Sequence, residues 1–111
     1  MQGSSSNGDF SIGFQNSVVN GDYSVGLSEG TTESGSDYSI SAQKSTVNGE
    51  YSLGLSNSTV TGNYSLGLSK GKVISSDYST AINNGTVDNS NNSISIGKNS
   101  FSGKVIYNID N

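Results

Sequence analysis

A short pattern that returns every 13 to 15 residues constrains this chain more than any other feature. An aromatic residue followed by serine recurs six times, at Phe10, Tyr23, Tyr38, Tyr51, Tyr64 and Tyr78, and Asn92 takes the aromatic place in a seventh copy. The flanking residues repeat as well, from GDFSIGF at 8–14 through GEYSLGL at 49–55 to SNNSISI at 90–96. Low complexity alone does not hold one register from residue 8 to residue 96, so the chain is built from one repeated structural unit.

Each copy contains two short segments with the character of a β-strand. In the first, Tyr51, Leu53 and Leu55 fall on one face and the small residues Ser52 and Gly54 on the other, because side chains alternate along a strand. The second segment carries an apolar residue two positions before a turn, at Val19, Val47, Val60, Ile74 and Phe101. No stretch has the 3.6-residue period of an amphipathic helix.

Two strands and two turns in so few residues match one coil of a parallel β-solenoid. We therefore predict an all-β, single-stranded solenoid of about 7 to 8 coils without helices. Residues 1–7 are expected to be an N-terminal cap or a vector-derived segment, 8–103 the repeat domain, and 104–111 a last partial coil or the start of a neck. The segment from Ser28 to Ser36 is two residues longer than its neighbours and lacks the valine, which predicts a coil with a bulged turn.

One serine position is the same in all seven copies: Ser11, Ser24, Ser39, Ser52, Ser65, Ser79 and Ser93. This uniformity predicts a tightly packed column, whose hydroxyls need hydrogen-bond partners on stacked neighbours or nearby backbone. Small residues such as Ser52 and Gly54 clear one face of the strand, which permits the close approach of a second chain or leaves a solvated face. Only 24 of the 111 residues are Leu, Ile, Val or Phe, and so small an apolar content favours a core shared between chains.

The residue types that the chain lacks exclude several functions. It has no Cys, His, Pro, Trp or Arg, which removes disulfides, thiolate and imidazole metal ligands, and Ser-His or Cys-His nucleophiles. A net charge of −4 with five lysines argues against nucleic acid and anionic membranes as partners. No apolar run is long enough to cross a bilayer, so we expect no membrane insertion by this segment. We likewise expect no enzymatic activity, no catalytic residue, no cofactor and no metal site.

Two columns remain as candidates for function. The residue before each aromatic is acidic or an asparagine: Asp9, Asp22, Asp37, Glu50, Asn63, Asp77 and Asn91. We interpret this column as turn chemistry, with a cation-binding ladder as the alternative. The aromatic column is either a structural stack or a binding stripe. As binding residues we predict Tyr23, Tyr38 and Tyr51, the tyrosines around the long turn, with Glu29 and Glu33 steering a basic partner.

The segment NSISIGKNSFSG, residues 92–103, resembles the head repeat of YadA-like trimeric autotransporter adhesins. It matches the N-S-V-A-I-G stretch of that family from Asn92 to Gly97, with Ser95 in place of the usual alanine. The resemblance extends over about residues 8–103. In six copies aromatics replace the family's asparagine, many coils are one residue short after the first strand, and alternating alanine is rare. The resemblance implies a left-handed parallel β-roll assembled as a homotrimer. It also implies an extracellular position, as the head of a larger protein anchored in a bacterial outer membrane, and binding to host cell-surface or matrix proteins or to glycans.

Two other functions stay open at this point. Ice-binding solenoids also stack short coils with a flat regular face, but they carry a Thr-x-Thr column, and here Thr59 and Thr61 form the one complete pair. A phage tail-fibre or receptor-binding segment is the third alternative, because such fibres are also trimeric β-rods. A measurement of thermal hysteresis distinguishes an ice-binding solenoid from an adhesin. The genomic context distinguishes a phage tail-fibre segment from an adhesin.

Overall fold

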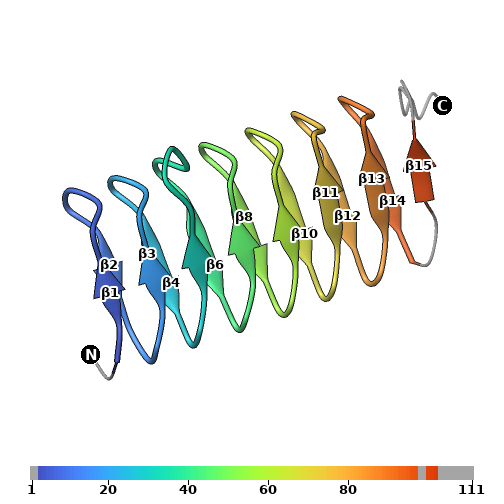
Figure 1. Cartoon of the computed structure of the whole chain (residues 1–111). Coiled ribbons are helices and arrows are strands. Elements are labelled where there is room, and N and C mark those ends of the chain that lie inside the picture. The colour runs from blue at the N-terminus through green and yellow to red at the C-terminus, as the bar shows by residue number, and fades with distance from the viewer. Residues whose placement is uncertain (1–2, 98–99, 103–111) are drawn as a thin grey trace, which may run out of the picture.

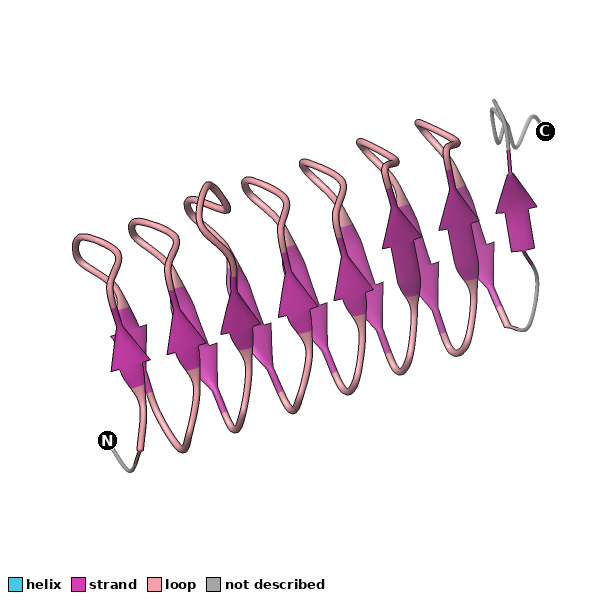
Figure 2. Cartoon of the chain, in the orientation of Figure 1, coloured by secondary structure: helices cyan, strands magenta, loops and turns pink. Residues whose placement is uncertain are grey.

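The computed structural model describes residues 3–97 and 100–102, and of the last three the backbone alone. These residues form fifteen short strands and no helix, as Figure 2 shows. The prediction of an all-β parallel solenoid without helices is therefore confirmed, with about seven turns. The segment 104–111 lies outside the described residues.

The strands belong to two parallel sheets, and each full coil contributes one strand to each. Sheet A runs in the order β1 (Ser5–Ser6), β3 (Val18–Val19), β5 (Thr31–Thr32), β7 (Thr46–Val47), β9 (Thr59–Val60), β11 (Lys72–Ile74), β13 (Thr86–Asp88) and β15 (Ser100–Ser102). Sheet B runs in the order β2 (Ile12–Gly13), β4 (Val25–Leu27), β6 (Ile40–Ala42), β8 (Leu53–Leu55), β10 (Leu66–Leu68), β12 (Thr80–Ile82) and β14 (Ile94–Ile96). Figure 1 shows the coils stacked side by side along one axis, with β1 at one end and β15 at the other.

The core between the sheets is one valine thick. Val47 and Val60 of sheet A are fully buried and point toward Gly54 and Gly67 of sheet B. A Cβ atom at Gly54 would lie 2.9 Å from Val47 Cγ2, and one at Gly67 would lie 2.8 Å from Val60 Cγ2. The two sheets thus pack so closely that each buried valine of sheet A fills the space beside a glycine of sheet B, which has no side chain of its own. This close packing explains how a chain with few large apolar residues forms a dense interior within a single copy.

The valine column differs from the predicted one at three positions, the first of which is Val87, a fully buried member that the prediction omitted. Val73, and not Ile74, pairs with Val60, while Ile74 pairs with Asp88 and points outward. In the coil without valine, Thr32 pairs with Val19 and Val47 and is fully buried. The prediction at Ile74 was wrong because it counted back from the following turn, and that turn is one residue longer than the turns after Val19, Val47 and Val60.

All the variation in coil length lies at one corner. From the aromatic residue to the buried residue of sheet A each coil has the same number of residues, as from Tyr51 to Val60 or from Tyr64 to Val73. The extra residue of the longer coils falls after the sheet A strand, where Ser75 and Asn89 adopt positive φ values of 47° and 51°. No coil is therefore shortened after its sheet B strand, contrary to what the family resemblance indicated.

The long coil is enlarged at the same corner, and the enlarged loop is visible in Figure 1 at the upper edge, in teal. The extra residues lie between Thr32 and Ser36 and include Gly35, at φ +88°. The predicted irregular segment from Ser28 to Ser36 was therefore too wide, because Thr31 and Thr32 form strand β5 in its middle. At the N-terminal end, β1 pairs with β3, so sheet A already includes residues 5–6 of the predicted cap.

Candidate functional site

The face of sheet B that turns outward is aliphatic, which reverses the expected arrangement of the strand. Within β8, Gly54 is buried while Leu53 and Leu55 are partly exposed, and the preceding Ser52 is buried as well. The small residues therefore do not clear a surface for another chain, because they face the valines of their own chain. The outward row comprises Ile12, Phe14, Val25, Leu27, Ile40, Ala42, Leu53, Leu55, Leu66, Leu68, Thr80, Ile82, Ile94 and Ile96. Thirteen of these fourteen residues are apolar, and all but Ala42 are partly or largely exposed.

The serine column lies inside the solenoid. Six of its seven members are buried, and Ser11 in the first coil is half-buried. Ser52 shows the bonding pattern: its hydroxyl donates to the carbonyl of Gly62 at 2.9 Å and accepts the backbone N–H of Ser65 at 3.0 Å. Ser39 makes the same two bonds, to Gly49 and from Ser52. From Ser24 to Ser79 each hydroxyl of the column thus ties its coil to the next, which gives the column a structural role.

A second serine ladder was not found from the sequence. Ser45 and Ser58 are buried at the corner that follows sheet B, and the Ser58 N–H donates to Ser45 Oγ at 3.0 Å. The Ser58 hydroxyl in turn donates to the Leu55 carbonyl at 2.6 Å. Glycine takes this position in other coils, at Gly30, Gly71 and Gly85, so the column has no single residue type that a search for repeats would detect.

The aromatic residues form one continuous stack at the corner that follows sheet A, which we call the aromatic corner. Successive ring centroids from Phe10 to Tyr78 lie 4.9 to 5.1 Å apart, and the planes of the tyrosine rings are within 6° of parallel. The predicted binding residues Tyr23, Tyr38 and Tyr51 are consecutive members of this stack. Tyr23 and Tyr51 are still 50% and 48% exposed. Since neighbouring rings cover each other's faces, the stack presents ring edges and hydroxyls to solvent.

These aromatic residues adopt a backbone conformation that their side chains disfavour. The φ values of Phe10 and the five tyrosines lie between 54° and 59°, in the left-handed region. This region costs an ordinary side chain about 1 to 2 kcal/mol, and asparagine is among the few residues that enter it readily. Asn92 occupies the same position in the seventh coil with φ 58°. Six coils therefore carry an aromatic residue where asparagine would fit the backbone better.

The stack also alters the acidity of one of its hydroxyls. The pKa of Tyr51 is raised above its ordinary value of 10.0, first by desolvation and then by the neighbouring Tyr38 and Tyr64 and the nearby carboxylates of Glu50 and Asp37. A tyrosinate at position 51 would lie beside two carboxylates and beside two phenols that are negative when they ionise, and these charges would repel it. The stack therefore favours the neutral phenol.

The acidic column accepts hydrogen bonds from the backbone of the preceding coil, and not from its own turn as the turn interpretation expects. Asp37 Oδ1 accepts the N–H of Asp22 at 2.9 Å, and Asn63 Oδ1 accepts that of Glu50 at the same distance. Equivalent bonds reach Asp22, Asp77 and Asn91. Among the members of the column from Asp22 to Asn91, Glu50 alone has a side chain that accepts no hydrogen bond from the preceding coil in the described part of the structure. In the same described residues, no three acidic side chains come together in a way that could hold a metal ion.

The two glutamates predicted to steer a partner lie at different corners. Glu33 follows β5 on the turn that leads into Asp37 and Tyr38. Glu29 lies across the strand, at the corner that follows sheet B, and its Oε2 is 3.8 Å from Nζ of Lys44. Glu29 therefore does not join Glu33 beside the tyrosines, because strand β5 separates them.

Comparison with protein-family models, with curated proteins and with solved structures finds no match to this chain. Within its described part, the chain has no helix of the kind that crosses a membrane.

Proposed function

We propose that this chain is a non-enzymatic binding rod, the head of a larger protein that is anchored in a bacterial outer membrane and displayed outside the cell. In this proposal the rod attaches to host cell-surface or matrix proteins or to their glycans. The observation that carries it is the exposed aliphatic face of sheet B, which extends over all seven strands from β2 to β14. An apolar face that a single threonine interrupts, and that runs the length of a solenoid, indicates a surface made for association.

The size of this face supports that interpretation. Seven strands of about three residues give a strip roughly 30 Å long and 10 Å wide, on the order of 300 Å² in flat projection. The largest apolar patch on a typical soluble monomer is about 300 to 600 Å² and is often functional, so this face has the size of a binding surface. At the first coil of the row Phe14 is 44% exposed, so the described residues of the chain do not cover the face there.

As the occupants of the face we propose two further copies of the same chain, packed side by side as left-handed rolls in a homotrimer. Each copy would turn sheet B toward a common axis, so that aliphatic side chains such as Leu53 and Leu66 meet their counterparts. A parallel arrangement places identical rungs at the same height, which matches the periodicity of the row along its whole length. Sheet A then faces outward, and the aromatic corner lies at the rim of the assembly.

We assign attachment to the aromatic stack, with Tyr23, Tyr38 and Tyr51 at its centre and Glu33 on the adjoining long turn. Two stacking contacts stabilise an inner tyrosine by about 1 to 3 kcal/mol, which is similar to the cost of its left-handed backbone. Stability alone therefore gives little reason to prefer tyrosine over asparagine at this position. Tyrosine is a frequent hot-spot residue in protein interfaces, and a half-exposed row of it supports a binding role.

The proposal is tested with a variant that suits the backbone but removes the rings. Tyr38→Asn with Tyr51→Asn keeps residues that tolerate positive φ, so the rod should stay folded with an unchanged mass in solution. Attachment to immobilised matrix proteins such as collagen or fibronectin, or to cultured host cells, should fall by at least about tenfold. Gln43→Ala, at the other corner, serves as the control. Unchanged attachment by the double variant would contradict the role of the stack, and loss of folding would show that the rings are structural.

One observation favours ice binding as a second candidate. The outer face of sheet A carries a partly exposed threonine in four of the coils, at Thr31, Thr46, Thr59 and Thr86. Thr61 alone continues the pattern two residues further on, since Asn48, Ile74 and Asp88 take that position in other coils. A purified rod that shows thermal hysteresis would support this candidate over the adhesin.

A further inference from the structure

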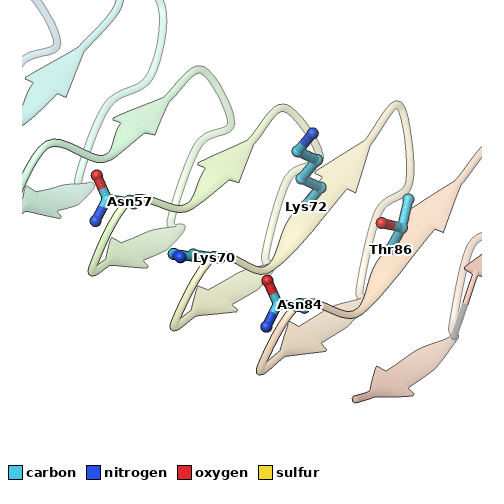
Figure 3. A pocket seen from close by; sticks show the side chains of 5 residues that line it. All are labelled: Asn57, Lys70, Lys72, Asn84 and Thr86. Atoms are coloured by element: carbon cyan, nitrogen blue, oxygen red, sulfur yellow. The ribbon is translucent and has the colours of Figure 1, made fainter. Parts of the chain in front are cut away.

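Every described lysine of the chain lies at or directly after the corner that follows sheet B, opposite the aromatic corner: Lys44 and Lys70 at the corner itself, and Lys72 as the first residue of β11. An open depression of about 530 Å³ lies over three adjacent coils there. Figure 3 shows Asn57, Lys70 and Asn84 in a row on successive corners, with Lys72 and Thr86 on the strands that follow. All five side chains can donate a hydrogen bond, and two of them carry a positive charge.

Within the described part of the chain, nothing neutralises the charge of the two lysines of this depression. Among the described residues, the one ion pair joins Lys44 to Glu29, so no carboxylate lies within bonding distance of Lys70 or Lys72. Glu29 is three rungs from Lys70, roughly 14 Å along the rod, which exceeds the distance over which exposed charges act in physiological salt. On the neighbouring strand, Asp88 lies at the far end of β13 from Thr86 and accepts a hydrogen bond from Asn89.

A second depression of about 330 Å³ adjoins the first and shares Asn57, Lys70 and Asn84 with it. Its other lining residues are Ser56, Ser69 and Asn83, so hydroxyls and carboxamides continue the surface without a carboxylate. Such groups pair readily with sugar hydroxyls, because they can both donate and accept. An elongated ligand could thus place an anionic group between Lys70 and Lys72, and could place its neutral hydroxyls over the second depression.

The geometry points to a binding site for an acidic polysaccharide, with a sulfate or carboxylate group held by Lys70 and Lys72. This inference rests on the proposed function, since it names one class of host ligand for the rod. Two free lysines on a rod of net charge −4 suit a chain with widely spaced anionic groups. Nucleic acids fit less well, because they depend on many phosphate contacts for affinity. The first three coils lack the site, since their equivalent corners carry Asn16, the paired Glu29 and the paired Lys44.

The test measures binding of the purified chain to defined oligosaccharides. Chondroitin sulfate and hyaluronan fragments provide sulfate and carboxylate groups, a neutral chitin fragment provides the sugar without charge, and inorganic sulfate provides the anion alone. We expect binding of at least one acidic fragment, weakening as salt rises, and none of the neutral fragment. Tighter binding of the fragment than of inorganic sulfate would identify a glycan site, whereas equal binding would reduce the site to one for simple anions and overturn the inference.

Variants locate the site. Lys70→Gln with Lys72→Gln should weaken binding of the acidic fragment at least about tenfold, because two charge-assisted contacts are lost. Lys44→Gln removes one positive charge from the same corner and should change the affinity less than about twofold, because that lysine is already paired. Equal losses in the two variants, or no binding by the unaltered chain, would overturn the inference. Attachment to host proteins through the aromatic stack would persist in either case, which separates this site from the proposed function.

Discussion

At the scale of single residues, the solenoid is held by polar side chains that reach from one coil to the next. Ser52 bonds to the carbonyl of Gly62 and the N–H of Ser65, and Asp37 accepts the N–H of Asp22. Their distances of 2.9 to 3.0 Å are those of well-formed hydrogen bonds. In a chain whose core is one valine thick, these bonds take over part of the stabilisation that larger apolar side chains provide elsewhere.

Removing one serine hydroxyl should therefore destabilise the rod. Ser52→Ala leaves the Gly62 carbonyl and the Ser65 N–H without their buried partner, and we expect the free energy of unfolding to fall by about 1 to 3 kcal/mol. Ser52→Leu should cost about as much or more, because the space beside the backbone is filled. Chemical denaturation measures both. The exposed Ser34→Ala is the control, and an equal effect in that variant would show that the buried ladder has no special role.

Glu50 offers the opposite test, a gain in stability. Its side chain is one methylene longer than aspartate and accepts no bond from the preceding coil in the described structure, unlike the other members of its column. Glu50→Asp should complete the ladder and raise the free energy of unfolding by about 0.5 to 1.5 kcal/mol. Asp37→Glu, the reverse change one coil earlier, should lower it by a similar amount. If both changes have the same sign, side-chain length does not control the ladder.

The tyrosine stack predicts a loss of stability in alkali. The pKa of Tyr51 in the folded rod lies above its unfolded value of 10.0, because desolvation and neighbouring tyrosines disfavour the tyrosinate. The stabilising contribution is therefore complete below pH 10.0 and disappears as the pH rises through the raised pKa. Melting temperatures measured across this range should fall, and less steeply in Tyr51→Phe. An identical pH profile for the two proteins would contradict the contribution of Tyr51.

At the scale of strands and turns, the sequence predicted the element type and the two-strand coil correctly but not which face is inside. Alternation alone places Leu53 and Ser52 on opposite faces without saying which is buried. The usual rule puts leucine inside, whereas the narrow space beside Val47 and Val60 admits only glycine, serine or alanine. The valine column was misread at Ile74 for a related reason, since the repeat was aligned on a turn whose length varies. The stacking of the tyrosines followed directly from the repeat, but the separation of Glu29 from Glu33 required knowledge of strand β5.

The confinement of length variation to one corner predicts where the chain tolerates insertion. One asparagine inserted between Thr61 and Gly62 would copy the longer coils, and we expect the stability to change by less than about 1 kcal/mol. One glycine inserted between Leu55 and Ser56 would break the constant spacing from Tyr51 to Val60 and shift the register of the core. That variant should be several kcal/mol less stable or fail to fold. Equal tolerance of the two insertions would contradict the fixed spacing.

At the scale of the whole molecule, the rod has four sides of different chemistry. Sheet B is aliphatic, sheet A carries threonines and Lys72, one corner holds the stacked aromatic residues with their carboxylates, and the other holds Lys44 and Lys70. Such an arrangement suits an assembly in which each side meets a different partner. The aliphatic side is the least favourable one to expose to water. Whatever covers this side therefore determines the oligomeric state of the protein in solution.

The mass of the purified chain in solution tests most directly whether further copies of this chain cover the aliphatic face. Light scattering over a range of concentrations should give about three times the 11.4 kDa of one chain, and Leu53→Glu with Leu66→Glu should reduce it to a single chain. A control pair on sheet A, Thr46→Glu with Thr59→Glu, should leave the mass of the trimer unchanged. A folded monomer at every concentration would contradict the proposal that copies of this chain cover the aliphatic face.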